Sequence, residues 1–153
     1  MIDTRITLAE LNSRRTNTLL ETLGIEFVDI NEDALVARMP VDNRTRQPLG
    51  LMHGGASAAL AETVGSTAAY LCVDRSRFYT VGLEIKCNHI RSVLFGYVYG
   101  TAKAVHIGKT TQVWQIEIKD ESGNLICYST HTIAVLDLDE GMKEKFKNLF
   151  FKV

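Results

Sequence analysis

Residues 49–72 read LGLMHGGASAALAETVGSTAAYLC, and this stretch decides the fold. After the paired glycines Gly54 and Gly55 the segment is rich in alanine, has few β-branched residues and contains no proline. These features predict a helix over about residues 54–72. The helix is small or apolar on almost every side, and such a helix must be buried. We therefore expect the rest of the chain to wrap around it.

The segments that follow have the pattern of strands. Stretches rich in β-branched and aromatic residues, with alternating faces, occupy residues 79–94, 96–107, 111–118 and 125–136. The connections between them, at 94–96, 106–109 and 120–124, are short and contain glycine. Short connections of this kind predict an antiparallel meander of four strands.

The N-terminal part predicts one helix and one hairpin. Thr7 and Glu10 have the spacing of a capping box, leucines follow at helical spacing, and Gly24 can end the helix, so we expect an amphipathic helix over residues 7–23. Residues 25–30 and 34–41 predict a short hairpin, and residues 139–153 a short helix or a partly ordered tail. One antiparallel sheet wrapped around one central helix is an α+β fold, here in a single domain over residues 1–153.

Length and composition exclude several classes of protein. A chain of 153 residues predicts about one domain, and a net charge of −1 without a basic tract argues against a nucleic-acid partner. Three cysteines without CxxC spacing predict free thiols in a reducing compartment. The first residues lack the apolar core of a signal peptide, and no apolar run approaches the ~20 residues that span a bilayer. We expect a cytoplasmic protein with no membrane partner.

The sequence also lacks the motifs of several enzyme classes. There is no GxGxxG, no Walker loop and no GxSxG, so nucleotide-binding and serine hydrolase chemistry are unsupported. No metal is expected, because the cysteines and histidines form no pattern of two close ligand pairs; they include Cys72, Cys87, His89, Cys127 and His131.

Glu62 is the exceptional residue of the central helix. It is the only acidic residue between Asp42 and Asp74. An ionised glutamate is almost never fully buried without a partner, and desolvation raises its pKa. A glutamate in a pocket is a candidate general base or nucleophile. The plainer alternatives are a helix face that reaches the surface there, or a glutamate paired with an arginine.

His53, Gly54 and Gly55 precede this helix. Glycines let a ligand approach the backbone, and the free N–H groups at a helix start suit a developing oxyanion. An ordinary glycine-rich loop is the alternative, but a carboxylate nine residues after His53 makes the combination a catalytic constellation. Ser66, four residues beyond Glu62, shares its helix face and could hold a carboxylate or a water. Gln47 could donate to the same carbonyl from the loop.

The end of the first long strand, residues 88–92, is polar. Alternation places His89 and Arg91 on the face opposite Asn88 and Ser92 unless a bulge intervenes. Arg91 and Ser92 are candidate phosphate contacts and His89 a candidate substrate contact. The equally weighted alternative is a strand that turns polar as it reaches solvent.

Two further positions are weaker candidates. Gly82 marks either a β-bulge, which we favour, or a place where a ligand meets bare backbone. His106 and Lys109 lie at a turn and could offer a second cationic contact, although a solvated hairpin is the favoured interpretation.

Two stretches together resemble a known family. QPLGLMHGGASAALAETVGS, residues 47–66, and VGLEIKCNHIRSV, residues 81–93, are similar to the hotdog-fold acyl-CoA thioesterases. The resemblance covers roughly residues 25–136 and is strongest to the aryl-CoA branch, which includes 4-hydroxybenzoyl-CoA, phenylacetate-pathway and 1,4-dihydroxy-2-naphthoyl-CoA thioesterases and the enterobactin proofreading thioesterase. It implies a homo-oligomer in which two protomers form a continuous sheet, usually within a tetramer, with active sites between subunits. Coenzyme A is part of the substrate, and no cofactor is implied.

The resemblance also implies roles by position. Glu62 would be the nucleophile or general base, and the Gly54 N–H would polarise the thioester carbonyl. Gln47 and His53 would line the carbonyl end, and Ser66 would assist the hydrolytic water. The residues implied to contact the substrate or CoA are Gly55, Gly82, His89, Arg91, Ser92, His106 and Lys109.

The expected function is hydrolysis of an aromatic acyl-CoA to free acid and CoA. A hotdog 3-hydroxyacyl thioester dehydratase ranks lower, because that chemistry needs a histidine–carboxylate pair and the spacing from His53 to Glu62 is more similar to thioesterases. A non-catalytic acyl-CoA binding protein also ranks lower, because sensing requires no carboxylate in an apolar helix and no DNA-binding segment is present.

Overall fold

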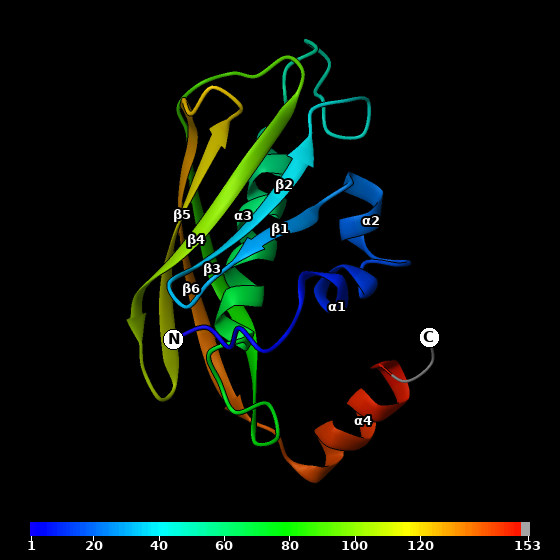
Figure 1. Cartoon of the computed structure of the whole chain (residues 1–153), viewed down its shortest axis with the longest axis vertical. Helices are drawn as coiled ribbons and strands as arrows, with labels where there is room; N and C mark the ends of the chain where they lie inside the picture. Colours follow the sequence, from blue (N-terminus) through cyan, green and yellow to red (C-terminus); the bar gives the residue numbers. More distant parts are fainter. Residues whose placement is uncertain (151–153) are drawn as a thin grey trace.

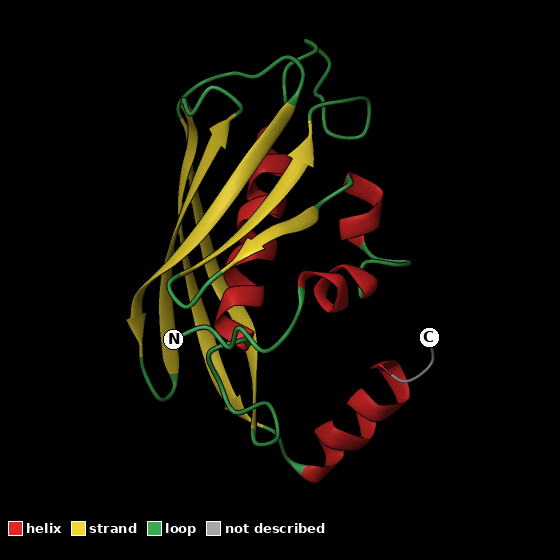
Figure 2. Cartoon of the chain, viewed as in Figure 1, coloured by secondary structure: helices red, strands yellow, loops and turns green. Residues whose placement is uncertain are grey.

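A six-stranded antiparallel sheet curls around one long helix, α3 (Gly54–Tyr70), in a computed structural model of the chain (Figure 1). The structure describes the backbone of residues 1–150 and the side chains of residues 1–145. The sheet order is β1-β2-β4-β5-β6-β3. The strands are β1 Glu26–Ile30, β2 Ala34–Pro40, β3 Phe78–His89, β4 Tyr97–Ile107, β5 Thr111–Asp120 and β6 Leu125–Asp137. The predicted α+β class, the central helix and the N-terminal hairpin are confirmed (Figure 2).

The predicted meander is wrong at its first connection. β3 pairs with β6 and not with β4, and β4 pairs with β2. The strand expected over residues 79–94 ends at His89, because the chain then leaves the sheet and crosses over the start of α3. Backbone hydrogen bonds fix this crossover: Met52 N–H donates to Val93 O, and Val41 N–H donates to Gly96 O. Strand β3 therefore lies at the edge of the sheet.

The predicted helix over residues 7–23 is two helices, α1 (Leu8–Ser13) and α2 (Leu19–Leu23). The capping box at Thr7 is present as predicted. The break has a local cause: Asn17 adopts a left-handed φ of 59°, and the Thr18 hydroxyl then accepts the Leu20 N–H as a new N-cap. A side-chain cap offers the backbone an alternative to continuing the first helix.

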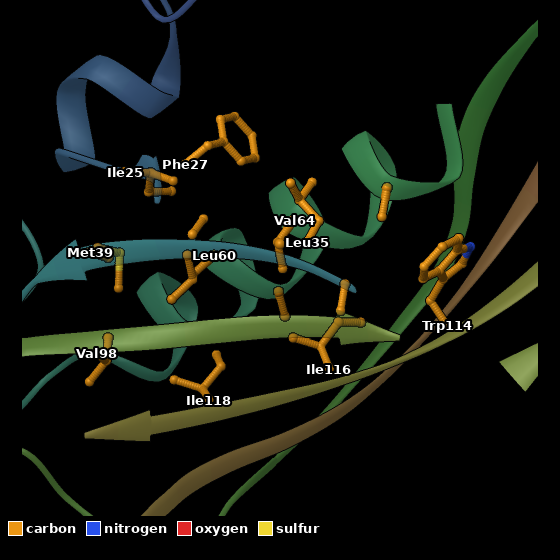
Figure 3. Close-up of a cluster of buried hydrophobic side chains, with 14 of the residues drawn as sticks. Ile25, Phe27, Leu35, Met39, Leu60, Val64, Val98, Trp114, Ile116 and Ile118 are labelled. Atoms are coloured by element: carbon orange, nitrogen blue, oxygen red, sulfur yellow. The ribbon is translucent and has the colours of Figure 1, made fainter. Parts of the chain in front are cut away.

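The core lies between α3 and the concave face of the sheet. Figure 3 shows Leu60 and Val64 of α3 facing side chains of β4 and β5, among them Ile116 and Ile118, and all four are fully buried. Ala61, Gly65, Ala68 and Ala69 are also buried, and such small residues let the helix approach the strands closely. The opposite face of α3 is only partly covered, so the helix is not buried on every side of the single chain.

The C-terminal segment forms α4 (Glu140–Phe150), which points away from the sheet in Figure 1. Of the two alternatives expected for this segment, a short helix and a partly ordered tail, the structure shows the helix, and residues 151–153 lie outside the described residues. The three cysteines are free thiols, as predicted. Within residues 1–150 no helix combines the length and the apolarity needed to cross a membrane.

Candidate active site

The start of α3 leaves one backbone donor open. His53 is the N-cap, and its Nδ1 accepts the Gly55 N–H at 2.8 Å. The Gly54 N–H has no acceptor among the described residues. A free N–H at the positive end of a helix is suited to stabilise an oxyanion. The capping histidine thus leaves Gly54, and not Gly55, as the available donor.

Gln47 is held with its amide donor free. Its backbone N–H donates to Leu51 O at 2.8 Å, and its side-chain Oε1 accepts the Leu49 N–H at 2.8 Å. Because Oε1 is engaged, the Nε2 group is the part of the amide left to donate. The loop before α3 therefore presents a second donor of the predicted type.

The crossover after β3 lies against the start of the helix. A Cβ on Gly54 would come within 2.8 Å of His89 Nε2, so the imidazole lies directly on the glycine backbone. A cavity of about 280 Å³ opens beside it and is lined in part by Arg91 and Ser92. The fold thus brings the predicted residues of 53–55 and 89–92 together. Arg91 and Ser92 lie beyond the end of β3, so the predicted alternation of faces does not extend to them.

Glu62 is anchored at both oxygens. Ser66 Oγ donates to Oε1 at 3.0 Å, which confirms the predicted shared helix face. His131 of β6 brings its Nε2 to 2.7 Å from Oε2. The Glu62 side chain is 42% exposed in the single chain, whereas that of His131 is fully buried. The partner of the glutamate is thus a histidine and not the arginine considered above.

The pKa of Glu62 shifts in the direction opposite to the one expected from burial. The contact with His131 lowers the pKa most, burial raises it, and the charge of His131 and the Ser66 hydroxyl lower it further. Hydrogen bonds to the charged form of a carboxyl favour that form. Glu62 is therefore held as a carboxylate at neutral pH.

Gly82 lies at a β-bulge and also leaves its backbone open to a close approach. The register of β3 against β6 shifts between Gly82 and Glu84, so the favoured bulge is confirmed. A Cβ on Gly82 would also lie 2.7 Å from Glu62 Oε1 and 2.8 Å from His131 Nε2. The bare backbone is thus approached by the carboxylate of the same chain, and Glu62 faces edge strand β3.

One chain does not bring all predicted residues together. Gly54 and Glu62 are eight residues apart on one helix, about 12 Å along its axis. His106 and Lys109 lie near the other end of α3, where Gln112 Nε2 donates to Ala69 O. The structure therefore divides the predicted site between the start of α3, its middle and its far end.

His131 is the residue of this site that the sequence analysis missed. Alternation along β6 buries Cys127, Ser129, His131 and Ile133, the face that packs toward α3. A single histidine on that face, opposite the single carboxylate of the helix, was the available signal. We considered His131 only as a metal ligand, and residues 1–150 contain no group of three candidate ligands.

Comparison with known proteins identifies the family. A model of the thioesterase superfamily matches residues 49–127. The chain belongs to this superfamily. The predicted thioesterase family and hotdog fold are therefore confirmed.

Relatives of this thioesterase are similar over most of their length. It is 51% identical over 132 residues to the 1,4-dihydroxy-2-naphthoyl-CoA hydrolase of Escherichia coli K12, covering 86% of this chain and 96% of that protein. It is 49% identical over 131 residues to the proofreading thioesterase EntH of Cronobacter turicensis, covering 86% and 95%. A crystal structure of a mutant thioesterase from Pseudomonas aeruginosa superposes with a TM-score of 0.88 at 44% identity, covering 90% of this chain and 99% of that one.

Proposed function

We propose that this thioesterase hydrolyses an aromatic acyl-CoA to the free acid and CoA, with Glu62 as the nucleophile or general base. The observation that carries the proposal is the Glu62 carboxylate, kept ionised by Ser66 and His131 and facing the open edge at β3. The names of the two relatives, a 1,4-dihydroxy-2-naphthoyl-CoA hydrolase and a proofreading thioesterase, support the substrate class.

The complete site requires a second chain. Strand β3 is twelve residues long, has no neighbour on its outer side within the described chain, and exposes Val81 and Leu83. An exposed apolar edge strand is a template for pairing with another chain. We therefore propose that β3 pairs antiparallel with the β3 of a second copy, in a dimer or a dimer of dimers.

The contacts of β3 also indicate the register of this pairing. Gly82 lies against Glu62, and His89 lies against Gly54. A two-fold axis between Ile85 and Lys86 sets Gly82 opposite the partner subunit's His89, roughly 5 Å away between Cα atoms. This register brings the carboxylate of one chain near the free Gly54 N–H of the other, which removes the separation of about 12 Å within one chain.

Two routes of hydrolysis are consistent with this site. In the first, Glu62 takes a proton from water while the water oxygen bonds to the thioester carbon. The carbonyl oxygen becomes an oxyanion that accepts hydrogen bonds from the Gly54 N–H and Gln47 Nε2, and one such donor contributes about 3 kcal/mol. The C–S bond then breaks and the CoA sulfur takes the proton from Glu62. In the second, the carboxylate attacks the carbon, CoA leaves, and water hydrolyses the mixed anhydride.

We assign the remaining residues around these steps. His53 orders the helix start and Ser66 the water, while Gly55, Gly82 and His89 border the acyl group. Arg91 and Ser92, exposed beside the cavity at the helix start, are proposed contacts for CoA phosphates. His106 and Lys109 lie at the opposite end of α3, so they could reach the same CoA only from another subunit. No cofactor or metal has a role in this scheme.

The histidine–carboxylate pair bears on the dehydratase alternative. The absence of such a pair was one reason to rank a dehydratase lower, and Glu62 and His131 do form a pair. However, His131 is fully buried behind Glu62, so its ring is shielded from any substrate proton. His131 therefore orients the Glu62 carboxylate and does not act on the substrate as a second acid–base group.

The decisive experiment measures CoA release with a thiol reagent. The panel contains benzoyl-, hydroxybenzoyl-, dihydroxynaphthoyl-, phenylacetyl- and palmitoyl-CoA. We expect aryl thioesters to be preferred, Glu62→Ala and Glu62→Gln to reduce kcat by at least about a hundredfold, and Thr63→Ala to remain active. Ligand binding without turnover by the wild type would instead indicate a binding protein. Dehydration of a 3-hydroxyacyl-CoA would indicate the dehydratase. Turnover that survives Glu62→Ala would refute the role of Glu62.

A further inference from the structure

We propose that His131 is a positioning residue for Glu62. Its Nε2–H contacts Oε2 of the carboxylate from the buried side, while the Ser66 hydroxyl donates to Oε1. Together the two contacts fix the glutamate in one orientation toward the open edge of β3. The inference rests on the proposed function for its meaning in catalysis. The contact itself is a property of the fold: the two atoms are 2.7 Å apart, and the imidazole is fully buried.

Two glycines on different elements make room for the pair. A Cβ on Gly65 of α3 would lie 2.8 Å from His131 Nδ1, and a Cβ on Gly82 of β3 would lie 2.8 Å from His131 Nε2. Any larger residue at either position would occupy the space of the ring. The imidazole is thus enclosed between the helix and the edge strand, and the direction from which it meets Glu62 is set by the backbone.

The contacts also assign the proton of the ring. Two bare lone pairs would repel each other at 2.7 Å, and the Glu62 carboxyl is ionised, so Nε2 carries the proton of this contact; its N–H is directed partly aside from Oε2. Nδ1 has no partner in the described part of the chain. The structure therefore assigns the donor role toward Glu62 to Nε2.

The consequence for Glu62 is a carboxylate that is ionised and does not rotate. Each oxygen is contacted from a separate element: Oε1 accepts from Ser66 of α3, and Oε2 lies 2.7 Å from His131 Nε2 of β6, while β3 brings the backbone of Gly82 close to Oε1. His131 is the titratable group found in contact with Glu62 among the described residues, and the hydroxyl of Ser66 is neutral.

The test measures the Glu62 carboxyl directly and in catalysis. The pKa of Glu62 is followed by ¹³C NMR, with Glu62→Gln to assign the signal, and kcat and KM are measured against pH with the best aryl-CoA. The variants are His131→Leu and His131→Met, which lack a donor, and His131→Gln, which keeps one near the position of Nε2. Ser129→Ala is the control, because Ser129 is buried on the same face of β6 but contacts Cys87 and Cys127.

We expect both variants without a donor to raise the pKa of Glu62 by roughly one unit, a tenfold change in its protonation equilibrium. They should lower kcat by roughly tenfold to a hundredfold with KM unchanged, while His131→Gln and Ser129→Ala stay near the wild type. An unmoved pKa in a folded His131→Leu or His131→Met protein would overturn the proposal. Should the wild type hydrolyse no thioester, the proposed function fails, and the NMR measurement still decides the role of His131.

Discussion

Gly82→Ala tests how closely strand β3 packs against the Glu62 carboxylate. The added Cβ would lie 2.7 Å from Glu62 Oε1 and 2.8 Å from His131 Nε2, whereas ordinary contact begins at 3.4 Å. The Glu62 carboxylate ends a half-exposed side chain and can yield, whereas the His131 ring is fully buried between Gly65 and Gly82. The carboxylate must move by roughly 0.7 Å, and a misplacement of about 1 Å can cost about a hundredfold in rate. We expect kcat/KM to fall by about ten- to a hundredfold.

The free energy of unfolding should also fall, by roughly 1 to 3 kcal/mol, because the added Cβ crowds the buried His131 ring, which Gly65 encloses on its other side. The assays are CoA release and urea denaturation, with sedimentation to confirm that the oligomer is intact. Gly100→Ala is the matched control on another strand, since its Cβ would meet Leu60 in the core and not Glu62. Wild-type activity in a Gly82→Ala protein would refute the close packing of strand, carboxylate and imidazole.

Three further predictions concern the helix start, the pH dependence and the edge strand. His53→Ala removes the acceptor of the Gly55 N–H and should destabilise the protein by about 1 kcal/mol in urea unfolding, while His53→Ser, which restores a cap, should recover most of the loss. The pKa of folded Glu62 is lowered from 4.5, so its ionised contacts stabilise the fold above about pH 4.5, and this contribution is lost as the pH falls through the lower folded pKa. Unfolding of Glu62→Gln should therefore depend less on pH in that range, and an acid limb of wild-type kcat/KM above pH 4.5 would contradict the shift. Leu83→Arg places a charge on the exposed apolar edge of β3. The variant should fold, sediment as a smaller species and lose activity. A fully active variant of unchanged size would exclude this edge as the interface.

Local patterns were sufficient for most elements of the fold. Alanine content and the absence of proline predicted α3 to within two residues of its observed end, and the Thr7 capping box is present as expected. The prediction of a single N-terminal helix was wrong because two local signals favoured different structures. Leucine spacing favoured one helix over residues 7–23, but Thr18 supplies a second N-cap and Asn17 turns the chain left-handed.

The strand order required information that no local pattern contains. The short connection Leu94–Gly96 contains glycine, as hairpin turns often do, but Val93 O and Gly96 O accept from Met52 and Val41, which are remote in the sequence. Those bonds carry the chain across the helix start, leave β3 at the edge and place β4 beside β2. A short connection with glycine cannot distinguish a hairpin from a crossover, because glycine permits the turn that either one requires.

The sequence by itself determined the central helix, the α+β class, the family resemblance and the residues of the helix start, since each depends on local propensity or on a contiguous motif. Only the tertiary structure decided which side chain partners Glu62. His131 is 69 residues away in the chain and meets the carboxylate because β6 and α3 pack against each other with glycines on both sides of the ring. The direction of the Glu62 pKa shift followed from that contact, because a nearby donor outweighs the burial that the sequence alone predicts.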